Sequence, residues 1–270
     1  MLADAIAAER YRLLRDRSSV FWGFLFVPVV SLALGLLTDL FVRARFGGPI
    51  PGGTTDLAAR LLKTLEGGAS PFVALFLLIG AAAIVAGDYR WETWRLLTPR
   101  NSRANLLAAK LIVFAEAAAW SLGLMALSSL IGGLFSAGIH GAPLVAPESG
   151  AVLGQLAGVF AITWLQIMVI GALAALVGVI SRSTMGATIT AIVAVVIQSI
   201  IATQMHAPTL KALSLPAYAG DVLKAFVTAP AGARPETGSA GLALLMLLLW
   251  LGALTTAAIV LFRRQDLTRE

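Results

Sequence analysis

The chain has 270 residues, of which 59% are hydrophobic and 13% are charged. An average soluble protein is roughly 25% charged, so this composition excludes an ordinary soluble domain and indicates a membrane protein. The net charge of +6 is explained by basic loops beside anionic lipid, and we favour that interpretation over nucleic-acid binding.

Six runs without Asp, Glu, Lys or Arg are long enough to cross a bilayer, which takes about 20 apolar residues. These runs are Ser18 to Thr38, Gly67 to Gly87, Ala117 to Pro147, Ser149 to Ser181, Ser183 to Leu210 and Thr237 to Phe262. The third, fourth and fifth exceed one span, so we expect each to include a loop, a tilt or an unwound turn. We predict an all-α integral membrane protein with one transmembrane domain over residues 1–270. Its six spans are placed at about 20–40, 71–87, 111–136, 152–180, 184–204 and 240–262.

Residues 2–17 alternate apolar side chains with four arginines. This pattern predicts an interfacial helix over residues 1–19 whose basic side chains reach lipid headgroups. The alternative is a helical extension of the first span. Within that span, Pro28 predicts a kink.

Two of the connecting segments are predicted to contain short helices. In residues 42–70, Thr55 or Asp56 can cap an amphipathic helix that ends near Gly67. In residues 205–239, the stretch LPAYAGDVLKAFV predicts a helix whose Leu223, Phe226 and Val227 dip toward the membrane.

The distribution of basic residues predicts the orientation of the chain. With the N-terminus inside, 13 of the 20 Lys and Arg residues fall in segments on the inner side. Both termini are therefore predicted to be cytoplasmic.

Residues 86–111, AGDYRWETWRLLTPRNSRANLLAAKL, form a charged and aromatic patch between the second and third apolar runs. Trp91 and Trp94 share a helical face, which predicts a short amphipathic helix that Pro99 ends. A simple interfacial loop is the alternative, because Trp and Arg both favour that depth.

This segment resembles the one that follows the second span in the ABC-2 type transporter permease family. The matching residues are Gly87, Asp88, Thr93, Leu96, Leu97, Pro99, Ser102, Arg103 and Lys110. AAERYRLLRDRSSVFW is similar to the family's N-terminal interfacial helix, and LFRRQDL at 261–267 is similar to its ending.

The resemblance implies the membrane-spanning subunit of an ATP-driven ABC exporter in the bacterial inner membrane. Its expected partners are two copies of a separate ATPase subunit, a second permease chain that is identical or related, and membrane lipid. The chain has no G-x-x-x-x-G-K-[ST] phosphate loop, so we expect ATP and Mg²⁺ on the partner and no cofactor here. A coupling helix between spans two and three would receive the ATPase's motion through Asp88, Tyr89, Arg90, Trp91, Glu92, Thr93, Trp94 and Arg95.

Polar residues inside the spans are candidates for a substrate pathway between two permease subunits. They cluster on one side of the fourth span and on one side of the fifth, at Gln155, Thr163, Gln166, Thr184, Thr188, Gln198 and Ser199. Hydrogen bonding between helices is the alternative for each of them. Glu116 is the acid that lies well inside an apolar run, and it can pair with a nearby Arg or assist gating. Few charges in these spans favour an amphipathic or lipid-like cargo.

Other functional classes fit less well. An intramembrane enzyme needs a nucleophile and a base at one depth, whereas His140 and His206 are predicted to be interfacial side chains at outer span ends and Asp39 to be solvated. We therefore expect no catalytic activity and no metal site. A secondary transporter or channel is expected to show an inverted repeat and buried carboxylates. The sequence shows neither of these signatures apart from Glu116. A non-transporting membrane assembly subunit stays open as a further alternative.

Overall fold

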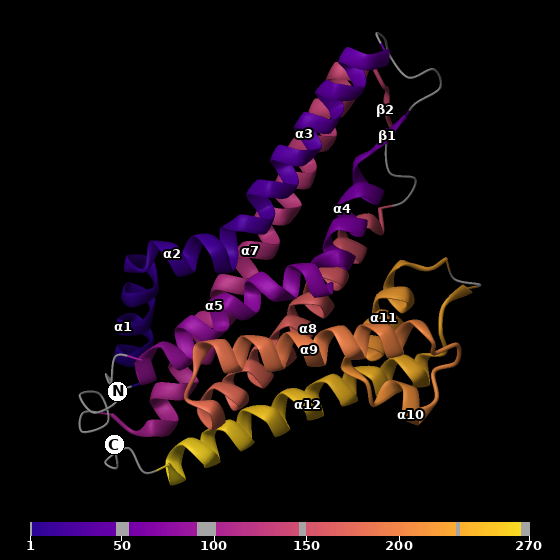
Figure 1. Cartoon of the computed structure of the whole chain (residues 1–270). Helices are drawn as coiled ribbons and strands as arrows, with labels where there is room; N and C mark the ends of the chain where they lie inside the picture. The colour runs from indigo at the N-terminus through magenta and orange to yellow at the C-terminus, as the bar shows by residue number, and fades with distance from the viewer. Residues whose placement is uncertain (1, 47–53, 91–100, 146–149, 231–232, 266–270) are drawn as a thin grey trace.

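The computed structural model describes residues 2–46, 54–90, 101–145, 150–230 and 233–265. In these ranges the chain is almost entirely helical (Figure 1). Its elements are α1 (Leu2–Arg15), α2 (Arg17–Val20), η1 (Phe21–Leu25), α3 (Phe26–Phe46), β1 (Thr55–Asp56), α4 (Leu57–Glu66), η2 (Gly67–Ala69), α5 (Pro71–Arg90), α7 (Arg103–His140), β2 (Leu144–Val145), α8 (Val152–Ser181), α9 (Thr184–Thr203), α10 (Leu210–Leu213), α11 (Pro216–Thr228) and α12 (Thr237–Arg264).

Six helices of the described chain are long and apolar enough to cross a membrane, which confirms the predicted all-α membrane class and the number of spans. They cover Arg17–Arg45, Pro71–Tyr89, Arg103–His140, Val152–Ser181, Thr184–Thr203 and Thr237–Arg264. The chain is therefore a multi-pass membrane protein.

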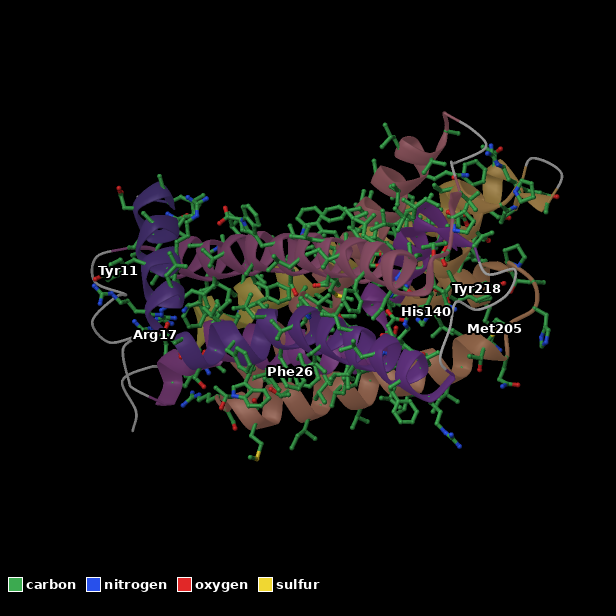
Figure 2. All side chains as sticks on the ribbon, turned by 90° about the horizontal axis from the view of Figure 1, so that it is seen from above. Tyr11, Arg17, Phe26, His140, Met205 and Tyr218 are labelled. Atoms are coloured by element: carbon green, nitrogen blue, oxygen red, sulfur yellow. The ribbon has the colours of Figure 1, made fainter. Side chains whose placement is uncertain are left out.

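The molecule has two ends, which are separated by the length of the spans. Figure 2 shows Tyr11 and Arg17 at one end and His140, Met205 and Tyr218 at the other. We call the first the terminal end, because α1 and the last turn of α12 lie there (Figure 1). The second, with α4, α10 and α11, is the distal end.

The helix α1 is separate from the first span. It ends at Arg15, and the side chain of Asp16 then caps α2 by accepting a hydrogen bond from Ser19 N at 3.1 Å. The chain changes direction there, and α1 packs against α7 (Figure 1). The first 15 residues are thus no extension of the span.

The first span is irregular where Pro28 enters it. Proline has no N–H for the carbonyl oxygen four residues earlier, which belongs to Phe24 in the π-helical turn η1. The hydroxyl of Ser121 on α7 donates to that oxygen at 2.7 Å. A side chain from another helix therefore satisfies the backbone acceptor that Pro28 leaves open, as apolar surroundings require.

The third apolar run is helical up to His140 and belongs to α7, a continuous helix of 38 residues. At 1.5 Å per residue α7 is about 57 Å long, nearly twice the roughly 30 Å thickness of a bilayer core. The extra length lies partly at its start, because the helix begins at Arg103 within the charged segment. The loop expected in this run begins after His140, where Gly141 adopts a left-handed conformation and ends the helix. Towards the distal end, α3 and α7 run side by side and diverge from α9 and α12 (Figure 1).

The spans pack closely where small residues meet. Gly171 of α8 lies against Phe114, since an added Cβ would be 2.1 Å from its ring, and Gly23 lies against the backbone of Gly80. By contrast, Gly154 of α8 has no neighbour within 4 Å among the described residues. Small residues therefore serve close helix packing inside this chain.

Short elements fill the distal end. Asp56 caps α4 by accepting a hydrogen bond from Ala59 N at 2.9 Å, and the helix ends before Gly67, which confirms that prediction. The parallel strands β1 and β2 pair Thr55 with Leu144. The predicted helix in the last long connection is α11, but its Leu223 is buried against α8 and α12 and does not face the membrane.

Candidate functional site

Among the described residues, four charged side chains from three distant segments form a cluster at the terminal end, and because three of them are buried we call it the buried cluster. Lys110 Nζ of α7 lies 2.7 Å from Asp88 Oδ2 of α5 and 3.1 Å from Glu9 Oε1 of α1. Arg12 of α1 completes the cluster, with Nη2 2.9 Å from Glu9 Oε2 and an ion pair to Asp88. Lys110 also donates to the carbonyl oxygen of Ile84 at 2.7 Å.

The four described side chains of the cluster have formal charges that sum to zero, and they stabilise one another. Lys110 is 0% exposed, Asp88 2% and Glu9 5%, so each charge is compensated by its neighbours and not by water. A buried charge that loses its partner is strongly destabilising. The cluster therefore fixes α1 to both helices that flank residues 91–100.

Further hydrogen bonds connect the same end of the bundle. The hydroxyl of Tyr89 donates to Gln265 Oε1 at 2.7 Å, and Gln265 Nε2 donates to the carbonyl oxygen of Val179 at 3.1 Å. Arg103 donates to the carbonyl oxygen of Phe262 at 3.2 Å. Together these bonds join the ends of α5, α8 and α12 to the start of α7.

Part of the predicted coupling segment belongs to this assembly. Asp88 is in the buried cluster, Tyr89 bonds to the end of the last span, and Arg90 is the last residue of α5. The remaining predicted coupling residues lie outside the described residues: Trp91, Glu92, Thr93, Trp94 and Arg95.

Glu116 pairs with an arginine, as predicted. Arg10 Nε of α1 donates to Glu116 Oε2 of α7 at 2.7 Å, and the guanidinium makes a second bond to Oε1. This pair is more exposed than the cluster, and it gives α1 a second ionic contact to α7.

A cavity of about 390 Å³ opens among the spans in the distal half of the molecule. We call it the distal cavity; α8, α9, α11 and α12 form its walls, and the start of α5 closes one side. Its inner part is apolar, with Val169, Ile170, Leu173, Val195 and Leu254. Its outer part holds the charged residues Glu66, Asp221 and Lys224.

Three of the seven predicted pathway residues line this cavity: Gln166, Gln198 and Ser199. Gln166 is 6% exposed, and its Nε2 donates to the carbonyl oxygens of Pro216 at 3.4 Å and Ala217 at 3.3 Å. Its Oε1 has no hydrogen-bond partner among the described residues.

The other four predicted pathway residues lie elsewhere. Thr163 is fully buried and donates to the carbonyl oxygen of Leu65 at 2.9 Å, so it joins two helices. Thr184 and Thr188 line a different surface groove, beside Asp16 and near the terminal end. Gln155 does not line the distal cavity.

The charged residues of the distal cavity were not predicted from the sequence. Lys224 is 7% exposed and its Nζ donates to the carbonyl oxygen of Glu66 at 2.8 Å. Burial lowers the pKa of Lys224, and Asp221 opposes that shift. Burial raises the pKa of Asp221, and Lys224 opposes it. Asp221 is exposed and lines the cavity.

Asp39 and His140 differ from the prediction of solvated, interfacial side chains. His140 is 5% exposed, and its Nε2 lies 3.5 Å from Asp39 Oδ1. The hydroxyl of Ser136 donates to the same carboxylate at 3.1 Å. These contacts hold the distal ends of α3 and α7 together.

The chain belongs to a family described as Protein of unknown function (DUF2705), whose family model matches residues 26–268. This match corrects the predicted membership in the ABC-2 type transporter permease family, which was wrong. The resemblance rested on one charged segment and on loose similarities near the two ends, and such patterns recur wherever a basic loop joins two spans. A search of curated proteins found no match.

Proposed function

We propose that this chain is the membrane-spanning subunit of an exporter for amphipathic molecules, powered by an ATPase on a separate chain. The observation that carries the proposal is the distal cavity, which is apolar in its inner part and charged in its outer part. Its volume of about 390 Å³ falls within the roughly 300–1,000 Å³ of small-molecule sites. An amphiphile would place its tail against Val169, Leu173 and Leu254 and its headgroup beside Asp221.

The charge distribution supports an orientation for this subunit. The terminal end carries the basic residues of α1 and the last turn of α12, so the positive-inside rule favours a cytoplasmic position for it. The distal cavity then lies in the outer half of a bacterial inner membrane. Amphipathic cargo entering it would leave on the outer side.

The buried cluster supports the mechanical part of the proposal. Residues 91–100 connect α5 to α7, and the ion pairs of Lys110 hold the adjoining ends of these helices together with α1. A partner that pushes on Asp88 to Arg95 would move the three helices as one unit. Because α5 packs against both α8 and α9, which line the distal cavity, that motion has a direct route to the cargo.

The proposed assembly contains two copies of the ATPase, which would bind ATP and Mg²⁺, and a second membrane chain, identical or related. Lipid would cover the many exposed apolar side chains of α3, α9 and α12. The chain itself would carry out no catalysis.

The test is ATP-driven uptake of a fluorescent amphiphile into inside-out membrane vesicles that contain the chain and its co-purifying ATPase. We expect uptake that depends on ATP and is lost when the charges of Arg90, Glu92 and Arg95 are reversed. Matched vesicles with reversed charges at exposed Lys211 and Glu236 should keep it. Uptake that needs an ion gradient and no ATP would instead indicate a secondary transporter, and no uptake at all would indicate an assembly subunit.

A further inference from the structure

The outer part of the distal cavity has more negative than positive charge. Glu66, Asp221 and Lys224 are its charged lining residues in the described chain, which gives a formal net charge of −1. The three charges are not equally available to a ligand. Lys224 is 7% exposed and already donates to the carbonyl oxygen of Glu66, whereas Asp221 is exposed on the same helix. A headgroup that enters therefore meets a carboxylate before it meets an ammonium group.

The neighbouring polar groups also favour a donor or a cation. Gln166 is 94% buried and its Oε1 has no partner within the described ranges, so a hydrogen-bond donor would satisfy an acceptor that is otherwise costly to bury. The indole of Trp250 lines the cavity, and its Nε1 donates to the carbonyl oxygen of Ser214 at 2.8 Å. That bond fixes the ring, and the face of a Trp ring attracts alkylammonium groups.

We infer that the distal cavity selects amphiphiles with a positively charged alkylammonium head over anionic ones of equal length. The inference rests on the transport function proposed above and names its substrate class. The tail occupies the apolar inner part, and the head lies between Asp221 and Trp250. An anionic head at the same place would face Asp221 and Glu66, with the ammonium of Lys224 turned to a backbone carbonyl.

The experiment measures binding to the purified full chain in a nonionic detergent. The probes share one tail: dodecylammonium, dodecyl sulfate and the neutral dodecyl glucoside. We expect the cation to bind about tenfold more tightly than the anion, which is the effect of one favourable charge contact of moderate burial. Asp221→Asn should lower the affinity for the cation about tenfold and leave the neutral probe unchanged. Glu236→Gln, which removes an exposed carboxylate outside the cavity lining, should leave all three affinities unchanged.

The neutral probe keeps the test decisive, because its binding shows that each variant retains the cavity. Equal or tighter binding of dodecyl sulfate, or unchanged binding of the cation by Asp221→Asn, would overturn the inference and leave the cavity as a site for amphiphiles. Failure of all three probes to bind saturably would overturn both the inference and the proposed cargo site. Loss of ATP-driven uptake with selective binding intact would overturn the proposed function alone.

Discussion

Replacing Lys110 by Met tests the buried cluster most directly. The two side chains are similar in length, so the substitution removes the ammonium group while it largely keeps the packing. Lys110 Nζ contacts Asp88 Oδ2 at 2.7 Å and Glu9 Oε1 at 3.1 Å, and both carboxylates are almost fully buried. Of the cations described in the cluster, the variant keeps the guanidinium of Arg12, whose side chain is 39% exposed.

The expected cost follows from the burial of the charges that remain. Removing one partner of a buried ion pair destabilises a protein by about 3–5 kcal/mol, because the other charge stays away from water. The cluster would change from neutral to a formal charge of −1. Asp88→Asn combined with Lys110→Met restores neutrality, so the double variant should be more stable than Lys110→Met alone.

The differences in unfolding free energy can be measured by unfolding each variant in mixed micelles with a rising fraction of denaturing detergent and following tryptophan fluorescence. Lys211→Met is the matched control, because Lys211 is exposed on α10 and its loss should change stability by no more than about 0.5 kcal/mol. A cost below about 1 kcal/mol for Lys110→Met, or a double variant less stable than the single one, would refute the interpretation of the cluster as a mutually compensated unit.

Three further changes test packing, titration and the cavity. Gly171→Ala would place a Cβ 2.1 Å from a buried aromatic ring and should destabilise the protein by about 1–3 kcal/mol in the same assay, whereas Gly154→Ala, with no neighbour within 4 Å, should be neutral or stabilising. Because burial raises the pKa of Asp221 above 3.8, its charge is lost at higher pH than that of a free aspartate, so titration should show dodecylammonium affinity falling as the pH drops through that raised pKa. The Asp221→Asn variant should lack this pH dependence. Gly220→Ala would place a Cβ 1.7 Å from Gln166 Nε2 and 2.0 Å from its Cδ and displace the buried amide, so stability and neutral-probe binding should both decrease; unchanged binding would contradict the described wall of the cavity.

The six spans follow from the sequence because each apolar run must satisfy its own backbone polar groups in lipid, and a helix does so without any partner. The start of α4 can also be predicted from neighbouring residues alone, because Asp56 is a capping residue directly before an amphipathic pattern. The length of α7, by contrast, depends on contacts with other elements and cannot be predicted from neighbouring residues. The start of α7 contains the charged residues Arg103 and Lys110. Hydropathy alone places charged residues in a loop, and the ion pair of Lys110 with Asp88 shows why this segment is helical and buried instead.

Helical periodicity predicts which residues share a face of a helix but not how far apart they lie along its axis, and the predicted substrate pathway shows this difference. Thr184 and Gln198 share one face of α9, but 14 residues at 1.5 Å each place them about 21 Å apart along its axis. One lies near the terminal end and the other in the distal cavity. The angular position of a residue around a helix does not tell how deep in the membrane that residue lies. Its depth relative to a cavity depends on the lengths and tilts of the neighbouring helices. Asp221 and Lys224 were missed because they belong to a connecting segment, whose packing against α8 depends on the tertiary structure.

The sequence feature that could have predicted the buried cluster is Lys110, a single basic residue within an apolar stretch. In LLAAKLIVF the side chain of Lys110 must either reach water or find an anion, and apolar neighbours on both sides make the second outcome favourable. Asp88 offered that anion at the end of the preceding span. What the sequence did not show is that Glu9 and Arg12 would join the pair, since an amphipathic basic helix is equally compatible with lipid headgroups. The structure separates these roles within α1: Glu9 and Arg12 face the bundle and fix its ends, while Leu14 is 74% exposed. The exposed side of α1 also carries Arg10 and Arg15, so it combines apolar and basic side chains, as a helix at a membrane surface does, while its inward charges fix it to α5 and α7.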